Sequence, residues 1–106
     1  MTDRELLELA AKAAEIAGFW VDDGLNTGSN ATPAVWNPLQ DDGDALRLAV
    51  KLKIQITPET YQDYEVTAYR RGYCEATEIA TMGYSIEEAT RRAIVRAAAE
   101  IGRKMK

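Results

Sequence analysis

The sequence predicts an α+β fold, in which helices pack on a mostly antiparallel sheet. Apolar residues recur every three or four positions in three segments, which is the helical period. Between these segments, shorter stretches alternate apolar and polar residues and are separated by turn residues, as strands in hairpins are. The expected order is α-β-β-α-β-β-β-α, within one domain of residues 1–106.

The composition is typical of a globular protein. The 106 residues are 46% hydrophobic and 28% charged, which is too apolar for a disordered chain. No apolar run approaches the roughly 18 residues that a membrane-spanning helix needs, and the acidic start of the chain differs from a secretion signal. The single cysteine, Cys74, excludes a disulfide within the chain. We therefore expect a cytoplasmic protein with no membrane partner.

The first predicted helix spans residues 2–17, where the apolar positions form one face. Thr2 and Glu5 match the capping-box pattern, in which each side chain accepts a hydrogen bond from the backbone N–H of the other residue. Gly18 follows at the position where a residue in the left-handed conformation commonly ends a helix.

Two short aromatic strands are predicted next, at residues 19–22 and 33–36. The segment between them, DDGLNTGSNATP, is rich in residues that favour turns. We expect the two strands to pair directly as a hairpin with a long tip. Trp20 and Trp36 lie in these strands, where they either pack in the core or contribute to a binding surface.

A central helix is predicted from residue 44 to about residue 53. Three aspartates precede or begin it: Asp41, Asp42 and Asp44. They could bind a cation, but an EF-hand loop starting at Asp41 would need a glutamate where Leu52 stands. A helix cap fits better, because a carboxylate accepts unpaired N–H groups and suits the positive end of the helix dipole. The helix is apolar around most of its circumference, which predicts a central position in the fold.

The second half of the chain predicts a three-stranded unit and a long helix. The strands are expected at residues 53–57, 64–70 and 73–80. Arg71 and Gly72 form the expected tight turn between the last two strands. The last helix is predicted over residues 85–104, with Ser85 and Glu88 as a second capping box and basic residues at its end.

The residue types present exclude several kinds of active site. The chain contains no histidine, so Ser-His-Asp and Cys-His catalysis are excluded. A zinc site would have to be built from one cysteine and carboxylates, which is an implausible ligand set. No glycine-rich phosphate-binding pattern is present. We expect no catalytic residues, no cofactor and no metal, and we expect the protein not to be an enzyme.

A binding surface is expected on the solvent-facing side of the hairpin. Its candidate residues are Glu65, Thr67, Tyr69, Tyr73, Glu75 and Thr77, with Trp20 and Trp36 near the polar loop. Aromatic and charged side chains on neighbouring strands suit a protein interface. The alternative is a nucleic-acid interface built from Arg70, Arg71, Arg91, Arg92 and Arg96. The net charge of −4 makes this alternative weaker.

The stretch WNPLQDDGDALRLAVKL, residues 36–52, resembles the phage ABA sandwich domain. It follows TDRELLELAAKAA and precedes EEATRRAIVRAAAEIG, and the resemblance covers residues 2–102. The family consists of small phage and prophage proteins of undefined molecular function. The resemblance implies a layered α-β-α fold and brings no catalytic residues. It implies a phage accessory protein in the bacterial host, whose expected partner is a phage or host protein and whose oligomeric state is open.

Overall fold

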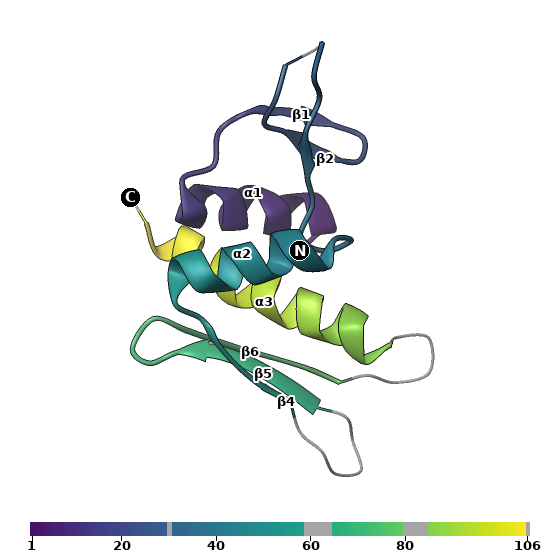
Figure 1. Cartoon of the computed structure of the whole chain (residues 1–106). Helices are drawn as coiled ribbons and strands as arrows, with labels where there is room; N and C mark the ends of the chain where they lie inside the picture. The colour runs from purple at the N-terminus through teal and green to yellow at the C-terminus, as the bar shows by residue number, and fades with distance from the viewer. Residues whose placement is uncertain (30, 59–64, 80–84, 106) are drawn as a thin grey trace.

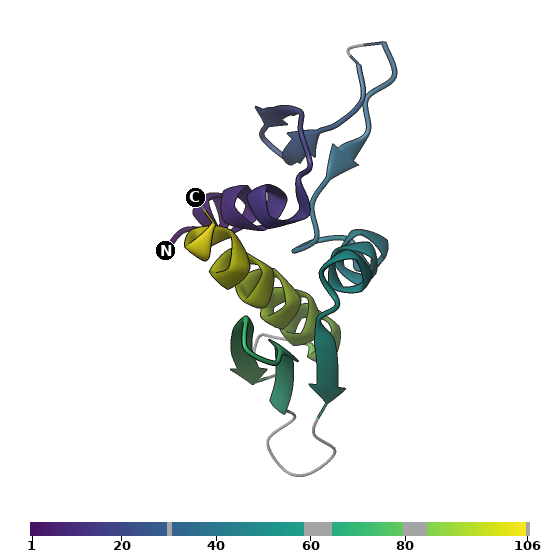
Figure 2. The same ribbon diagram turned by 90° about the vertical axis from the view of Figure 1, so that its left-hand side faces the viewer.

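The computed structural model describes residues 1–29, 31–58, 65–79 and 85–105. In this part of the chain it contains three helices and six strands, which confirms the α+β class. The strands form two antiparallel three-stranded sheets, and the helices lie between them (Figures 1 and 2). The helices are α1 (Asp3–Ala14), α2 (Asp42–Leu52) and α3 (Ile86–Lys104).

The first sheet contains β1 (Phe19–Val21), β2 (Gly24–Asn26) and β3 (Val35–Trp36). The prediction of a direct hairpin between the outer two strands was wrong, because β2 lies between them and Leu25 pairs with both tryptophans. Gly24 permits this close arrangement: its φ is +145°, and a Cβ atom there would lie 2.4 Å from the Trp36 carbonyl oxygen. A three-residue strand with one apolar side chain shows too little alternation to be recognised in the sequence.

Helix α1 begins as predicted and ends earlier than predicted. The Thr2–Glu5 capping box is formed, with the Glu5 N–H donating to Thr2 Oγ1 at 3.1 Å. The helix ends at Glu15, which adopts the left-handed conformation (φ 56°) and donates its N–H to carbonyls of the last turn. Gly18 therefore is not the C-terminal cap. It makes room for β2, because a Cβ atom on Gly18 would lie 2.2 Å from the Asn26 carbonyl oxygen.

The second sheet has the order β4 (Gln55–Pro58), β5 (Glu65–Arg70) and β6 (Cys74–Ile79). Its buried side chains face α3 and include Val66, Ala68 and Ala76. Arg70 pairs with Cys74, so the connecting turn has three residues rather than the predicted two, and Tyr73 lies in the turn rather than in β6.

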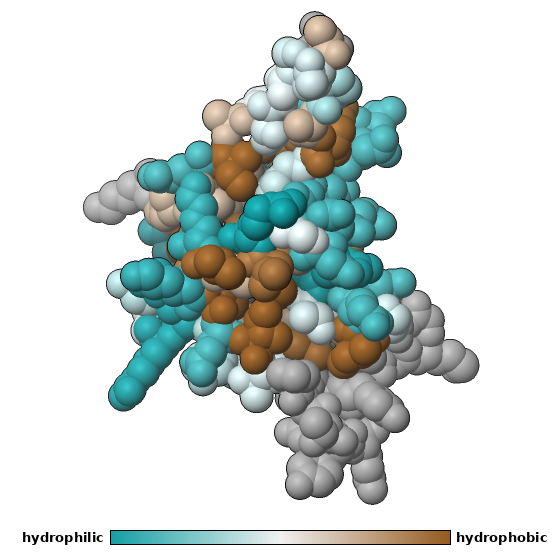
Figure 3. Space-filling view, in the orientation of Figure 1, coloured by the Kyte–Doolittle hydropathy of each residue, from teal (hydrophilic) through white to brown (hydrophobic). Residues whose placement is uncertain are grey.

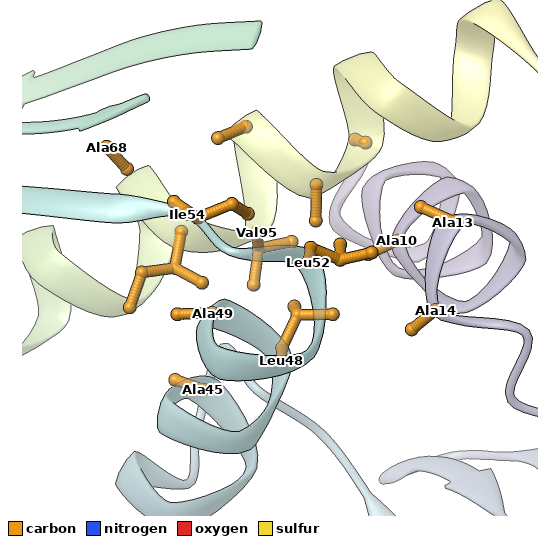
Figure 4. Packing of buried hydrophobic residues seen from close by; sticks show 14 of the residues in the cluster. Ala10, Ala13, Ala14, Ala45, Leu48, Ala49, Leu52, Ile54, Ala68 and Val95 are labelled. Atoms are coloured by element: carbon orange, nitrogen blue, oxygen red, sulfur yellow. The ribbon is translucent and has the colours of Figure 1, made fainter. Parts of the chain in front are cut away.

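Helix α3, and not α2, is the central helix. It packs against α1, α2 and the second sheet, and it starts at Ser85, whose Oγ accepts the Glu88 N–H at 3.1 Å. Small residues let the neighbouring helices approach closely: a Cβ atom on Gly102 would lie 2.0 Å from the Leu9 carbonyl oxygen of α1. Figure 4 shows alanine, leucine and valine side chains meeting where the three helices come together.

Helix α2 packs on the core with one side only. The buried side of this helix consists of Ala45, Leu48, Ala49 and Leu52. The opposite face is open to solvent, so the prediction that α2 is the central helix was wrong. The layering also differs from the α-β-α order implied by the family resemblance. In the described part of the chain, the second sheet receives most of its helical contacts from α3, and the helices form a layer between the two sheets (Figure 1).

Candidate protein-binding surface

The three aspartates at the start of α2 make their contacts within the chain, and Arg47 lies near two of them, Asp41 at 3.8 Å and Asp44 at 2.8 Å. Asp41 is the N-cap, and its Oδ2 accepts the Asp44 N–H at 2.8 Å. Asp44 is buried, accepts the Asn37 N–H at 3.0 Å and pairs with Arg47 at 2.8 Å. Through these contacts the two carboxylates stabilise the start of α2, and they do not converge on a common binding pocket.

Asp42, the third aspartate, bonds to Arg91 of α3 at 2.6 Å. Its partner thus lies on another helix, away from the Asn37 and Arg47 contacts of Asp44. Among the described residues, no group of three histidine, cysteine, aspartate or glutamate side chains is arranged to hold a metal ion. In the same residues, every buried side-chain nitrogen or oxygen atom has a hydrogen-bond partner. The arrangement supports a structural role for the acidic cluster.

The predicted surface on the second sheet is mostly polar. Thr67 and Thr77 pair across the strands, with their hydroxyl oxygens 3.2 Å apart. Tyr69 is half-buried opposite the exposed Glu75. Glu65 pairs with Ile79 at the end of the strands, and its side chain lies outside the described residues.

The hairpin turn carries the remaining candidates of that surface. Tyr73 is 50% exposed, and the guanidinium of Arg70 lies 4.0 Å from the centre of its ring. Arg70 also donates to the Leu52 carbonyl oxygen at 3.3 Å, so this side chain ties the turn to the end of α2. Arg71 is exposed at the tip of the turn.

The two tryptophans do not form part of that sheet. Trp36 is 8% exposed and belongs to the hydrophobic core, so it is not available as a surface contact. Trp20 is half-buried in the first sheet, and the guanidinium of Arg4 lies 4.3 Å from its ring centre. The first and second sheets lie at opposite sides of the helical layer, which separates these tryptophans from Tyr69 and Tyr73 (Figure 2).

The arginines of α3 make contacts within the chain. Arg91 donates to the Leu39 carbonyl oxygen at 2.9 Å as well as to Asp42. The other two arginines also have acidic partners: Arg92 pairs with Asp3 at 3.0 Å, and Arg96 pairs with Glu78. These three guanidinium groups connect α3 to other elements of the fold.

The arginines also fail to form one basic surface. Lys104 Nζ donates to the Tyr73 carbonyl oxygen at 3.0 Å, so the hairpin turn lies beside the C-terminal end of α3. Arg91 precedes Lys104 by 13 residues of helix, which is roughly 20 Å at the rise of an α-helix. Arg70 and Arg71 are therefore far from Arg91 on the molecule.

The outer face of α2 is the apolar surface that the sequence interpretation missed. Leu46 is 59% exposed and Val50 is 69% exposed. Beside Leu46, a groove of about 240 Å³ runs between α2, β4 and α3, and its apolar walls include Ile56 and Ile86. Figure 3 shows hydrophobic side chains gathered over α2 and beside it. We call Leu46, Val50, Ile56 and Ile86 the α2 surface.

A signal for this surface was present in the sequence. Apolar residues surround most of α2, a pattern that arises when a helix is enclosed by the core and also when its free face binds something. The sequence alone did not distinguish these cases, because the number of elements that pack around a helix is a property of the tertiary structure.

Cys74 is the one nucleophilic thiol of the chain, and it lies in the core beneath α3. Burial raises the pKa of this thiol above its ordinary value. A raised pKa keeps the thiol protonated near neutral pH, which is the opposite of what a catalytic or redox-active cysteine requires. The residue therefore packs as a small apolar side chain.

None of the helices in the described part of the chain is long and apolar enough to cross a membrane. No family model, no curated protein and no solved structure matches the chain.

Proposed function

We propose that this chain is a non-enzymatic protein-binding module and that its partner binds at the α2 surface. The observation that carries the proposal is the exposure of Leu46 and Val50 on a helix whose other side is packed in the core. Fully burying a leucine or valine side chain contributes about 1.5–3 kcal/mol, so covering this pair would stabilise a complex substantially.

The neighbouring groove strengthens the proposal. Interfaces combine apolar and polar side chains, and here the groove is lined by the apolar Leu46, Ile56 and Ile86 and also by the charged Asp42 and Glu87. The second sheet offers a weaker surface, because its Thr67–Thr77 pair is already hydrogen-bonded and Tyr69 is half-buried. A phage or prophage accessory role, as the family resemblance implies, is compatible with such a module.

The nucleic-acid alternative has less support. Arg70, Arg91, Arg92 and Arg96 all bond to other groups of the chain, so binding phosphate would require breaking those bonds. If the chain is a protein-binding module, we expect no binding of labelled DNA or RNA at low salt. Binding that weakens steeply with salt concentration would favour the alternative instead.

Co-purification with matched variants tests the proposal. The double variant Leu46→Gln/Val50→Gln keeps helix-forming residues and removes the apolar face, so we expect it to lose the proteins that the wild-type chain retains from a bacterial lysate. The control variant is Phe19→Gln/Val35→Gln, since these exposed residues lie in the first sheet, at 45% and 43% exposure. Equal retention by all three chains would contradict the proposal.

A further inference from the structure

We infer that the partner at the α2 surface is a second copy of this chain, bound through an antiparallel pair of α2 helices. This inference rests on the proposed function, because it names the occupant of the same surface. It is carried by the distribution of charge along α2, by the position of its apolar residues and by the balance of charge in this region.

The charges on α2 are polarised along the helix. Asp41 and Asp42 lie at its N-terminal end, with side chains 59% and 76% exposed. Lys51 and Lys53 lie at its C-terminal end, and both are exposed. When two such helices pack antiparallel, the acidic end of each lies beside the basic end of the other, and complementary charges then favour this register over a parallel one. The antiparallel arrangement also aligns the two helix dipoles favourably.

The exposed apolar residues of α2 lie between these charged ends along the helix. Leu46 and Val50 are four positions apart, so they are neighbours on the helix surface. A two-fold axis between the two helices, at the level midway between Leu46 and Val50, would place Leu46 of one chain beside Val50 of the other, and the reverse contact would form by symmetry. The exposed apolar pair thus matches its own copy in position along the helix.

Charge balance also favours a second copy. The region from Asp41 to Lys53 contains three acidic and three basic residues: Asp41, Asp42, Asp44, Arg47, Lys51 and Lys53. It is therefore neutral in a chain whose net charge is −4, and two chains can meet here with little repulsion. A uniformly basic or acidic partner helix would complement one end of α2 and be repelled by the other.

Sedimentation velocity over a range of protein concentrations tests the inference. We expect the wild-type chain to pass from monomer to dimer as concentration rises, because a contact between two 11-residue helices is short and reversible. We expect Leu46→Gln/Val50→Gln to remain monomeric, and Phe19→Gln/Val35→Gln to dimerise as the wild type does. A dimer of Leu46→Gln/Val50→Gln as tight as that of the wild type would overturn the inference.

A charge exchange tests the antiparallel arrangement. Lys51→Glu/Lys53→Glu places acidic ends beside each other in its own dimer, so we expect this chain alone to dimerise about tenfold or more weakly. Asp42→Lys neutralises the acidic end, which removes its attraction to Lys51 and Lys53 and should also weaken the dimer of this chain alone. In a mixture of the two, the acidic N-terminal end of the first variant lies beside the basic Lys51 and Lys53 end of the second, and the lysine introduced at position 42 lies beside the introduced glutamates. The heterodimer should therefore form more tightly than either variant alone. Circular dichroism checks that both variants fold. A mixture that dimerises no better than its components would overturn the antiparallel pairing.

The two proposals fail in distinguishable ways. A wild-type chain that stays monomeric throughout overturns the second copy as occupant. In that case, a lysate protein lost only by Leu46→Gln/Val50→Gln would still support the α2 surface as a binding site. If the chain neither dimerises nor retains any protein through this surface, the proposed function is wrong as well.

Discussion

At the residue scale, one buried carboxylate joins the first sheet to the start of α2. Asp44 accepts the N–H of Asn37, which directly follows β3, and also holds Arg47 on its own helix. Asp44 itself is held in place because its N–H donates to Asp41. Asp44 therefore takes part both in the local cap of α2, through its backbone N–H, and in a contact with the first sheet, through its carboxylate.

Replacing Asp44 should therefore destabilise the fold. We expect Asp44→Ala to lower the free energy of unfolding by about 1–3 kcal/mol, because the Asn37 N–H loses its acceptor. The control is Asp42→Ala, whose ion pair with Arg91 involves a 76% exposed carboxylate and should contribute no more than about 1 kcal/mol. Urea denaturation compares the two, and an equal loss in both variants would show that the Asn37 bond contributes little.

At the element scale, the contact between α1 and α3 depends on the absence of a side chain. Gly102 lies in the last turn of α3, against the backbone of Leu9. A glycine within a helix costs about 1 kcal/mol relative to alanine, so this position trades helix propensity for close packing. Helix α2 shows the opposite situation, because the side that carries Leu46 and Val50 is exposed and packs against no other element of the described chain.

Two glycine-to-alanine substitutions should have different effects. Gly102→Ala would place Cβ 2.0 Å from the Leu9 carbonyl oxygen, so α1 and α3 must move apart, and we expect a loss of about 1–3 kcal/mol. Gly43→Ala in α2 would meet only the tips of Arg47 and Asp41, at 3.2 Å, and should change stability by less than about 1 kcal/mol. Thermal and urea unfolding measure both. A Gly102→Ala protein as stable as wild type would mean that the helices can separate at little cost.

At the whole-molecule scale, the fold is a layer of helices with a sheet on either side. Its principal extents of 46, 31 and 23 Å reflect this elongated arrangement. The second sheet is attached through its buried face to α3, and Cys74 lies within that contact. The rate at which this thiol reacts therefore reports whether the second sheet remains packed against α3.

We expect Cys74 to react with a thiol reagent only when the structure opens. Labelling of the native protein at neutral pH should be far slower than in denaturant and should accelerate as the protein unfolds. The control is Tyr73→Cys in a Cys74→Ala background, which places a thiol at a 50% exposed position of the turn and should react at once. Rapid labelling of native Cys74 would show that the sheet separates from α3 without global unfolding.

The same thiol makes stability depend on pH in a defined direction. Burial raises the pKa of Cys74 in the folded state. The contribution of the protonated thiol to the free energy of unfolding is therefore fully present below the ordinary thiol pKa of about 8.5. As pH rises above that value the unfolded chain ionises first, and the contribution is lost progressively up to the folded pKa. Urea denaturation from pH 7 to pH 10 should show this loss in the wild type, and Cys74→Ala should lack that part of the slope.

Much of the local structure was predictable because its causes are local. The helix starts at Thr2, Asp41 and Ser85 depend on bonds between residues three positions apart, and such bonds are visible as sequence patterns. The ends were less predictable: Glu15 took the left-handed position expected of Gly18, whereas Gly18 lies where β2 approaches closely.

By itself, the sequence determined the α+β class, the three helices, the strands of the second sheet and the absence of histidine chemistry. The tertiary structure decided which helix is central, that β2 enters the first sheet, and that Trp36 is buried while Leu46 and Val50 are exposed. The reason is physical: helical period and capping depend on neighbours along the chain, whereas burial depends on elements distant in sequence. The candidate binding surface belongs to the second kind of property.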